Sequence, residues 1–176
     1  MRKVEIKDYD RAWIRRFLDE KEILEKILPT NAIIHHIGST SVEGVAAKPI
    51  IDILVEVLSL TDIDSKNQEF SENGYVSKGE NGITNRRFFY KLDESGNRLT
   101  HVHIFPTGSD NVIRHIAFRD YLRNHSQEAA EYSKIKQELA EKHPMDIEAY
   151  IDGKDSFVKE LEKVALNWYT SKKRER

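Results

Sequence analysis

The hydrophobic pattern of the first third of the chain predicts one helix followed by two strands. From Asp10 to Leu28 the apolar residues recur three and four positions apart, which predicts a helix that Pro29 ends. The short apolar segment 32–37 predicts a strand. The nearly continuous apolar segment 50–57, IIDILVEV, predicts a second strand that is buried on both faces.

The middle of the chain predicts one more helix and a pair of strands. Thr61 and Asp64 have the spacing of a capping box, so we expect a helix that begins there and ends near Gly74. The segments 86–92 and 100–105 have strand composition and are separated by ESGN, a sequence typical of hairpin turns.

From position 112 onward the pattern is helical. Three helices are expected, over 113–123, over 126–143 with a serine cap at its start, and over 157–169. The final SKKRER is expected to be a frayed, solvated end. This order of elements predicts an α+β fold with a helical C-terminal region, and 176 residues are expected to form a single domain, 1–176.

Composition narrows the classes of function. A net charge of −2 argues against a nucleic-acid partner, which would need a broad basic face. The chain has no cysteine, so any metal must be bound by Asp, Glu or His. No segment resembles a signal peptide or approaches the roughly 20 apolar residues of a membrane span. We therefore expect a cytoplasmic protein with no membrane partner.

The most informative segment reads HIGSTSVEGVAAKPIIDILVEV. Gly38 permits a sharp turn after a strand, and Ser39, Thr40 and Ser41 then offer hydroxyls beside backbone N–H groups. Such a turn can bind an anion, and Lys48 adds a charge that can reach a phosphate. The alternative is a connecting turn that happens to be rich in serine.

An acid follows the turn inside an otherwise apolar strand. A carboxylate such as that of Asp52 is costly there unless it is paired or binds a cation. Functional acids occur in such environments, and the spacing allows the turn and the acid to converge. The alternative is a polar seam along the strand, or a salt bridge to Lys48.

These features resemble the GrpB family of the nucleotidyltransferase superfamily. The similarity rests on the segment above, on THVHIFPTGSDNVIRHIAFRDYLRNH and on the W-x-x-x-F of Trp13 and Phe17. It implies a nucleotidyltransferase-like mixed β-sheet flanked by helices. It also implies that the Gly-Ser turn binds nucleotide phosphates, while acids at alternate positions of one strand and a third acid on its neighbour bind Mg²⁺.

The chain departs from that pattern at the acids. Leu54 occupies the alternate position, and Glu56 lies about 13 Å from Asp52 along a regular strand, too far to share one ion. His101 and His103 share a face of a neighbouring strand, so with Asp52 they can bind one divalent ion, Mn²⁺ or Zn²⁺ in preference to Mg²⁺. His103 is also the candidate general base. The alternative is that both histidines bond loop backbone.

Basic residues supply a candidate phosphate-binding wall. Arg86 and Arg87 are adjacent on a strand, so only one can face the site. Arg87, Arg114 and Arg119 fall within the family-like motifs and are predicted to contact phosphate through their guanidinium groups. The alternative is that they are solvated or paired with acids such as Asp120.

Two functions remain open. The first is a metal-dependent nucleotidyl or phosphoryl transferase that uses Mg²⁺ or Mn²⁺ and a nucleotide or phosphorylated small molecule, with Asp52 and His103 as catalytic residues. The second is an inactive module that binds a nucleotide or a CoA-like ligand and supports a partner enzyme. Proteins similar to this chain also occur joined to dephospho-CoA kinase, which makes that enzyme the candidate partner.

Overall fold

The computed structural model describes residues 3–175, which divide into two compact units. We call them the helical unit and the sheet unit. The helical unit comprises the described residues of Met1–Arg11, Ser39–Pro49 and Ile113–Arg176, and the sheet unit comprises Ala12–Gly38 and Ile50–Val112. Neither unit is one continuous run of sequence, and the Gly-Ser turn divides at the bond between Gly38 and Ser39.

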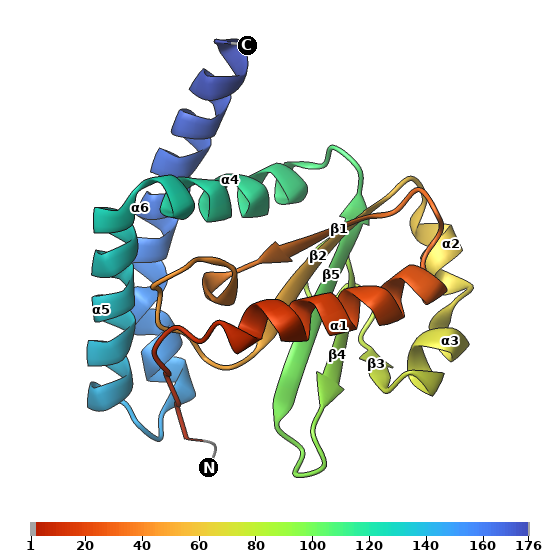
Figure 1. The fold of residues 1–176 in the computed structure, drawn as a ribbon, viewed down its shortest axis with the longest axis horizontal. Helices are drawn as coiled ribbons and strands as arrows, with labels where there is room; N and C mark the ends of the chain where they lie inside the picture. Colours follow the sequence, from red (N-terminus) through yellow and green to blue (C-terminus); the bar gives the residue numbers. More distant parts are fainter. Residues whose placement is uncertain (1–2, 176) are drawn as a thin grey trace. The chain divides into compact units, whose positions relative to one another are not determined.

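The sheet unit contains a mixed sheet of five strands. They are β1 (Ile33–Ile37), β2 (Ile51–Val57), β3 (Tyr75–Ser77), β4 (Arg87–Leu92) and β5 (Arg98–Pro106). Their order is β1-β2-β5-β4-β3; β2 and β5 are parallel, and the other pairs are antiparallel (Figure 1). The predicted mixed sheet is therefore confirmed. Only β3 escaped prediction, because three residues are too few to display an alternating pattern.

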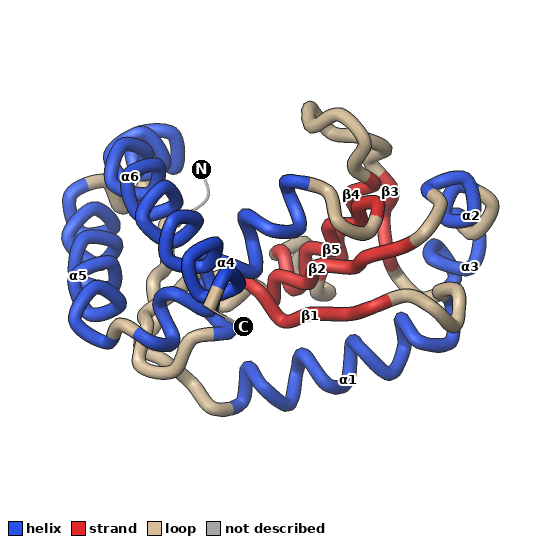
Figure 2. The backbone as a smooth tube through the Cα atoms, turned by 90° about the horizontal axis from the view of Figure 1, so that it is seen from above, coloured by secondary structure: helices blue, strands red, loops and turns tan. Residues whose placement is uncertain are grey.

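Three helices accompany the sheet: α1 (Ala12–Ile27), α2 (Leu60–Asp64) and α3 (Asn67–Glu72). Helix α1 runs along one face of the sheet (Figure 2). The Phe17 ring of this helix stacks on the His36 ring of β1, with 4.6 Å between the ring centroids. On α3, the fully buried Phe70 ring stacks on Phe89 of β4 at 4.0 Å. These aromatic contacts fix the helices to the apolar face of the sheet.

The helix expected between Thr61 and Gly74 forms as the two short helices α2 and α3. The predicted capping box is wrong, because Ser59 is the N-cap of α2, its side chain makes no capping bond, and Thr61 lies inside the helix. Gly74 does end the segment, with a φ of 84° that favours glycine and an N–H bonded to the carbonyl of Ser71.

The helical unit contains the 3₁₀ turn η1 (Ser39–Ser41), α4 (Asp110–Asn124) from Ile113 onward, α5 (Ser126–Lys142) and α6 (Ile147–Arg174). Helices α5 and α6 lie side by side (Figure 1). Their core joins loop residues to all three helices: Val42, Val45, Tyr121, Leu122, Ala129, Tyr132, Leu161 and Ala165. The loop after η1 is therefore anchored by its own apolar side chains.

Three expectations for the helical region are wrong. Helix α6 begins ten residues before the predicted 157, because the Asp146 carboxylate caps it by accepting the Ala149 N–H, and it continues to Arg174 where a frayed end was expected. At α5 the N-cap is His125 and not Ser126. Across positions 3–175, no helix combines the length and apolar character needed to cross a membrane.

Candidate functional site

Strand register brings Asp52, His101 and His103 together in the sheet unit. Asp52 pairs with His101 and Leu54 with His103, so the carboxylate and both imidazoles lie on one face of β2 and β5. The Asp52 Oδ1 atom is 3.4 Å from His101 Nδ1 and 3.6 Å from His103 Nε2. Within residues 3–175, this is the one group of at least three His, Cys, Asp or Glu side chains that lie close enough together to hold a metal ion.

The site is partly open to solvent. The Asp52 side chain is 32% exposed and that of His103 is 15% exposed, so an ion can reach them. Burial alone would raise the pKa of the Asp52 carboxyl. Hydrogen bonds from His101 and His103, together with the charges of these two side chains, hold that pKa well below its ordinary value. Asp52 is therefore an anion at neutral pH. The Phe88 ring packs against both imidazoles, with centroid distances of 5.4 and 5.2 Å, and limits their movement.

The separations from Asp52 to the two histidines suit a single divalent ion. Two ligands that each lie about 2.1 Å from an ion at the tetrahedral angle are about 3.4 Å apart, and the separations at Asp52 are 3.4 and 3.6 Å. Two imidazoles and one carboxylate favour Zn²⁺ or Mn²⁺ over Mg²⁺, which prefers oxygen ligands. Glu56 does not join the set; its Oε1 lies 2.8 Å from His35 Nε2.

Gly38 makes room for the acid. Its φ is 71°, and a Cβ at this position would lie 2.9 Å from Asp52 Oδ2. That separation is too short for a side chain, so glycine is required both by the turn and by the close approach of Asp52.

We expect Gly38→Ala to lower the free energy of unfolding by about 2–3 kcal/mol and to weaken metal binding, since strain in this region costs about 1–3 kcal/mol and Asp52 must also shift. Gly44→Ala is the matched control, because Gly44 has a φ of 81° with no atom within 4 Å of the added Cβ. It should cost only the backbone strain, about 1–2 kcal/mol, and leave metal affinity unchanged. Urea unfolding and metal titration measure both; equal effects of the two substitutions would refute the close approach.

The arginine beside the metal site is Arg86, not the predicted Arg87. The Arg86 side chain is buried, with Nη1 3.4 Å from His103 Nδ1 and the guanidinium 4.9 Å from the Phe88 ring centroid. Arg87 pairs with Ile104 and therefore points to the opposite face, where it binds both carboxylate oxygens of Asp64 at 2.6 and 2.9 Å. The choice between two adjacent arginines depends on where the strand begins, which the sequence left open.

In the helical unit, the Gly-Ser turn is bonded to α4 and α5. The Ser39 hydroxyl accepts a hydrogen bond from Lys136 at 2.7 Å, and the Ser41 carbonyl accepts two from Arg123 at 2.9 and 2.7 Å. Thr40 and Ser41 are buried, whereas Ser39 is half-buried. Sequence reasoning missed Lys136, because a lysine in an amphipathic helix usually faces solvent.

The other predicted phosphate contacts already have partners in this unit. The Lys48 ammonium lies 4.7 Å from the Tyr150 ring centroid. Arg114 binds Glu162 at 2.9 Å, and Arg119 binds Asp120 at 2.8 Å. The two arginines thus take the alternative that the sequence left open, pairing with acids.

Comparison with known sequences identifies relatives along most of the chain. Residues 3–164 match the family described as GrpB protein. The chain is 47% identical to UPF0157 protein YqkA of Bacillus subtilis over 95% of its own length but only 48% of YqkA, so it spans about half of that relative. It is 39% identical to glutamate-rich protein GrpB of Alkalihalophilus pseudofirmus, covering 85% of this chain and 88% of that one. A weaker match, 26% identical, joins 78% of this chain to 40% of a dephospho-CoA kinase of Mycolicibacterium paratuberculosis.

Comparison with solved structures supports the fold. The crystal structure of GrpB from Enterococcus faecalis superposes with a TM-score of 0.89 at 41% identity, covering 94% of this chain and 99% of that one. The Cid1 poly(U) polymerase with Mg 3′-dATP bound superposes with a TM-score of 0.54 at 13% identity, covering 76% of this chain and 44% of the polymerase chain. At that identity the likeness concerns the fold alone, which is nucleotidyltransferase-like.

Proposed function

Since the chain belongs to the GrpB protein family, we propose that it is a metal-dependent transferase of nucleotidyl or phosphoryl groups. One observation carries the proposal: the convergence of Asp52, His101 and His103 at ligand separations that suit one divalent ion. A carboxylate kept ionised between two imidazoles on adjacent strands is a typical metal-binding arrangement.

The residues of the sheet unit take distinct roles in this proposal. Asp52 supplies the negative charge of the metal site, and His101 and His103 supply neutral nitrogen ligands. A divalent ion bound there would neutralise charge on phosphate oxygens. Buried Arg86 lies beside His103 and adds a positive charge next to the metal site. Gly38 keeps the space that Asp52 occupies.

The proposed phosphate contact lies within the helical unit. Ser39 follows Gly38 directly in sequence, and its half-buried hydroxyl is the member of the Ser39–Ser41 turn that is least enclosed. We assign phosphate binding to Ser39 and to the backbone of this turn, with a nucleotide or a phosphorylated small molecule as the ligand.

A second function is favoured by two specific observations. Leu54 stands where an active nucleotidyltransferase would carry a second acid, and Arg114 and Arg119 are occupied by carboxylates. A module that binds a nucleotide or CoA-like ligand without catalysis fits these features. The similarity to part of a dephospho-CoA kinase makes that enzyme the candidate partner.

Isothermal titration calorimetry separates the two functions. ATP, CTP and GTP are titrated with and without Mg²⁺ or Mn²⁺ into the wild-type protein and into Asp52→Ala. The transferase requires binding that depends on the metal and is lost in Asp52→Ala. Binding that ignores both the metal and Asp52, yet disappears in Ser39→Ala/Ser41→Ala, supports the module. If no nucleotide binds, the transferase is refuted and only a CoA-like or other ligand remains for the module.

A further inference from the structure

A buried lysine of α5 connects that helix to the Gly-Ser turn. Lys136 is 2% exposed, and its ammonium donates hydrogen bonds to the Ser39 hydroxyl, at 2.7 Å, and to the Ala46 carbonyl. The ammonium also lies 4.4 Å from the Tyr132 ring centroid. Burying a cation is costly unless hydrogen bonds compensate it, so this side chain holds one specific arrangement of the turn.

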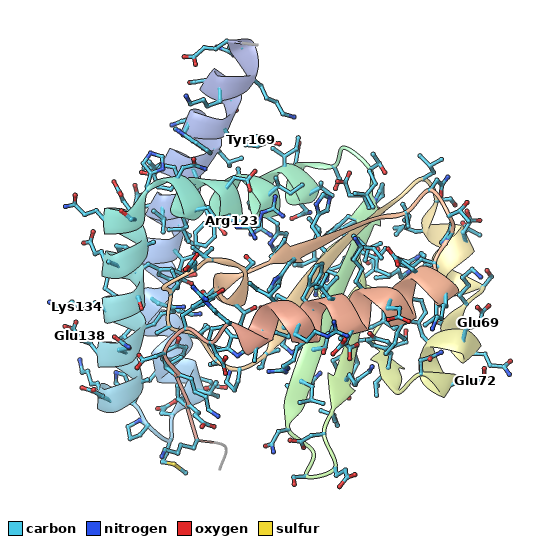
Figure 3. All side chains as sticks on the ribbon, in the orientation of Figure 1. Glu69, Glu72, Arg123, Lys134, Glu138 and Tyr169 are labelled. Atoms are coloured by element: carbon cyan, nitrogen blue, oxygen red, sulfur yellow. The ribbon has the colours of Figure 1, made fainter. Side chains whose placement is uncertain are left out.

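Two further side chains fix the same loop. The Ser133 hydroxyl, one turn of α5 before Lys136, accepts the Ala46 N–H at 2.9 Å. Arg123, which points from α4 towards η1 (Figure 3), donates to the Ser41 carbonyl. The segment between Ser39 and Ala46 is therefore bonded to two helices through both its start and its end.

The bond to Lys136 also decides which way the Ser39 hydroxyl can act. A serine hydroxyl has one hydrogen and two lone pairs. An ammonium can only donate, so Lys136 occupies a lone pair of Ser39 Oγ and the hydroxyl hydrogen must point away from the ammonium. A hydroxyl in this state is set to donate to an oxygen acceptor, and the nearby positive charge strengthens that donation.

We propose that Lys136 is a positioning residue that holds the Gly-Ser turn in shape and orients the Ser39 hydroxyl as a hydrogen-bond donor to a phosphate group. This inference rests on the proposed function for its ligand. The contact between Lys136 and the turn is independent of the proposed function, so an experiment without ligand can examine it.

The first experiment follows amide hydrogen exchange without ligand. Lys136→Met removes the ammonium and keeps the length of the side chain. We expect residues 39–48 to exchange at least about tenfold faster in this variant, because one hydrogen bond to a charged group contributes about 1.5–3 kcal/mol. Lys134→Met is the matched control. Lys134 is exposed on the same helix (Figure 3), and its ammonium lies 3.7 Å from the Glu138 carboxylate. This change should leave the loop as in the wild type. Unchanged exchange in Lys136→Met would overturn the inference.

The second experiment is a double-mutant cycle on the affinity for ATP with Mn²⁺. Ser39→Ala and Lys136→Met should each weaken binding about tenfold, as expected for a lost hydrogen bond to a charged group. The double variant should bind no more weakly than Ser39→Ala alone, because Lys136 acts through Ser39. The inference would be overturned if the affinity losses of the two single variants multiplied in the double variant. It would also be overturned if Lys136→Met lost thermal stability but kept its affinity for ATP. If Lys136→Met does not fold, Lys136→Gln takes its place with the same expected outcome.

The two experiments distinguish the failure of this inference from the failure of the proposed function. If wild-type protein binds ATP and Lys136→Met binds it equally well, only the role of Lys136 is refuted. If wild-type protein binds no nucleotide, the proposed function and the phosphate role of Ser39 are refuted together. The exchange experiment then decides separately whether Lys136 holds the turn.

Discussion

Replacing Asp52 by asparagine should lower the affinity for Mn²⁺ or Zn²⁺ by at least about 100-fold, because even the loss of a residue that only supports a ligand costs about 10–100-fold. Asp52 is the one anion among the three ligands, and asparagine keeps its shape while removing its charge. Calorimetric titration of the metal ion alone measures this effect without any assumption about a nucleotide.

Asp64→Asn is the control for that experiment. The Asp64 carboxylate binds Arg87, a residue of the opposite face of the sheet, and its side chain is 46% exposed. Its removal should leave metal affinity as in the wild type. Equal affinity in Asp52→Asn and the wild type would mean that the ion binds elsewhere or not at all.

Phe70→Ala should lower the free energy of unfolding by about 3–5 kcal/mol, the usual cost of emptying a phenylalanine site in a core. Phe70 is fully buried, its ring stacks on Phe89 and its centroid lies 5.8 Å from that of Tyr75. It therefore joins α3 to two strands of the sheet unit. Urea unfolding measures this loss directly, provided that the dependence of the free energy of unfolding on urea concentration is the same in both proteins.

Leu58→Ala provides the comparison for Phe70→Ala. Leu58 directly follows β2 and is 72% exposed, so its truncation should change the free energy of unfolding by no more than about 0.5 kcal/mol. A loss below about 1 kcal/mol for Phe70→Ala would contradict the packing described for α3, since core truncations of this size cost several times more.

The sequence predicted those parts of the fold that have a local signal. The apolar run of β2 and the periodicity of α1 and α4 are properties of neighbouring residues, and each element formed close to the expected bounds. Strand order has no such signal. β5 pairs on one side with its hairpin neighbour β4 and on the other, in parallel, with the distant β2. That second pairing places His101 beside Asp52, so the triad was a hypothesis until the register was known.

The contacts of the Gly-Ser turn show where sequence reasoning ends. Lys136 and Ser39 are separated by 97 positions, and nothing in YSKIKQELAEKH distinguishes the buried Lys136 from the exposed Lys134. Arg114 and Arg119 were expected to face phosphate, and the structure pairs them with Glu162 and Asp120. Asp120 directly follows Arg119 in the sequence, whereas Glu162 lies 48 positions from Arg114. The second pairing depends on helix packing, which a single sequence does not encode in any local pattern.

A crystal of the protein soaked in Mn²⁺ and examined by anomalous scattering shows whether Asp52, His101 and His103 bind one ion. We expect one peak about 2.0–2.3 Å from Asp52 Oδ1, His101 Nδ1 and His103 Nε2, the range of bond lengths that carboxylate and imidazole ligands allow, and no peak in His103→Ala. Absence of the peak in wild-type crystals, or its persistence in His103→Ala, would contradict a metal centre at these three residues.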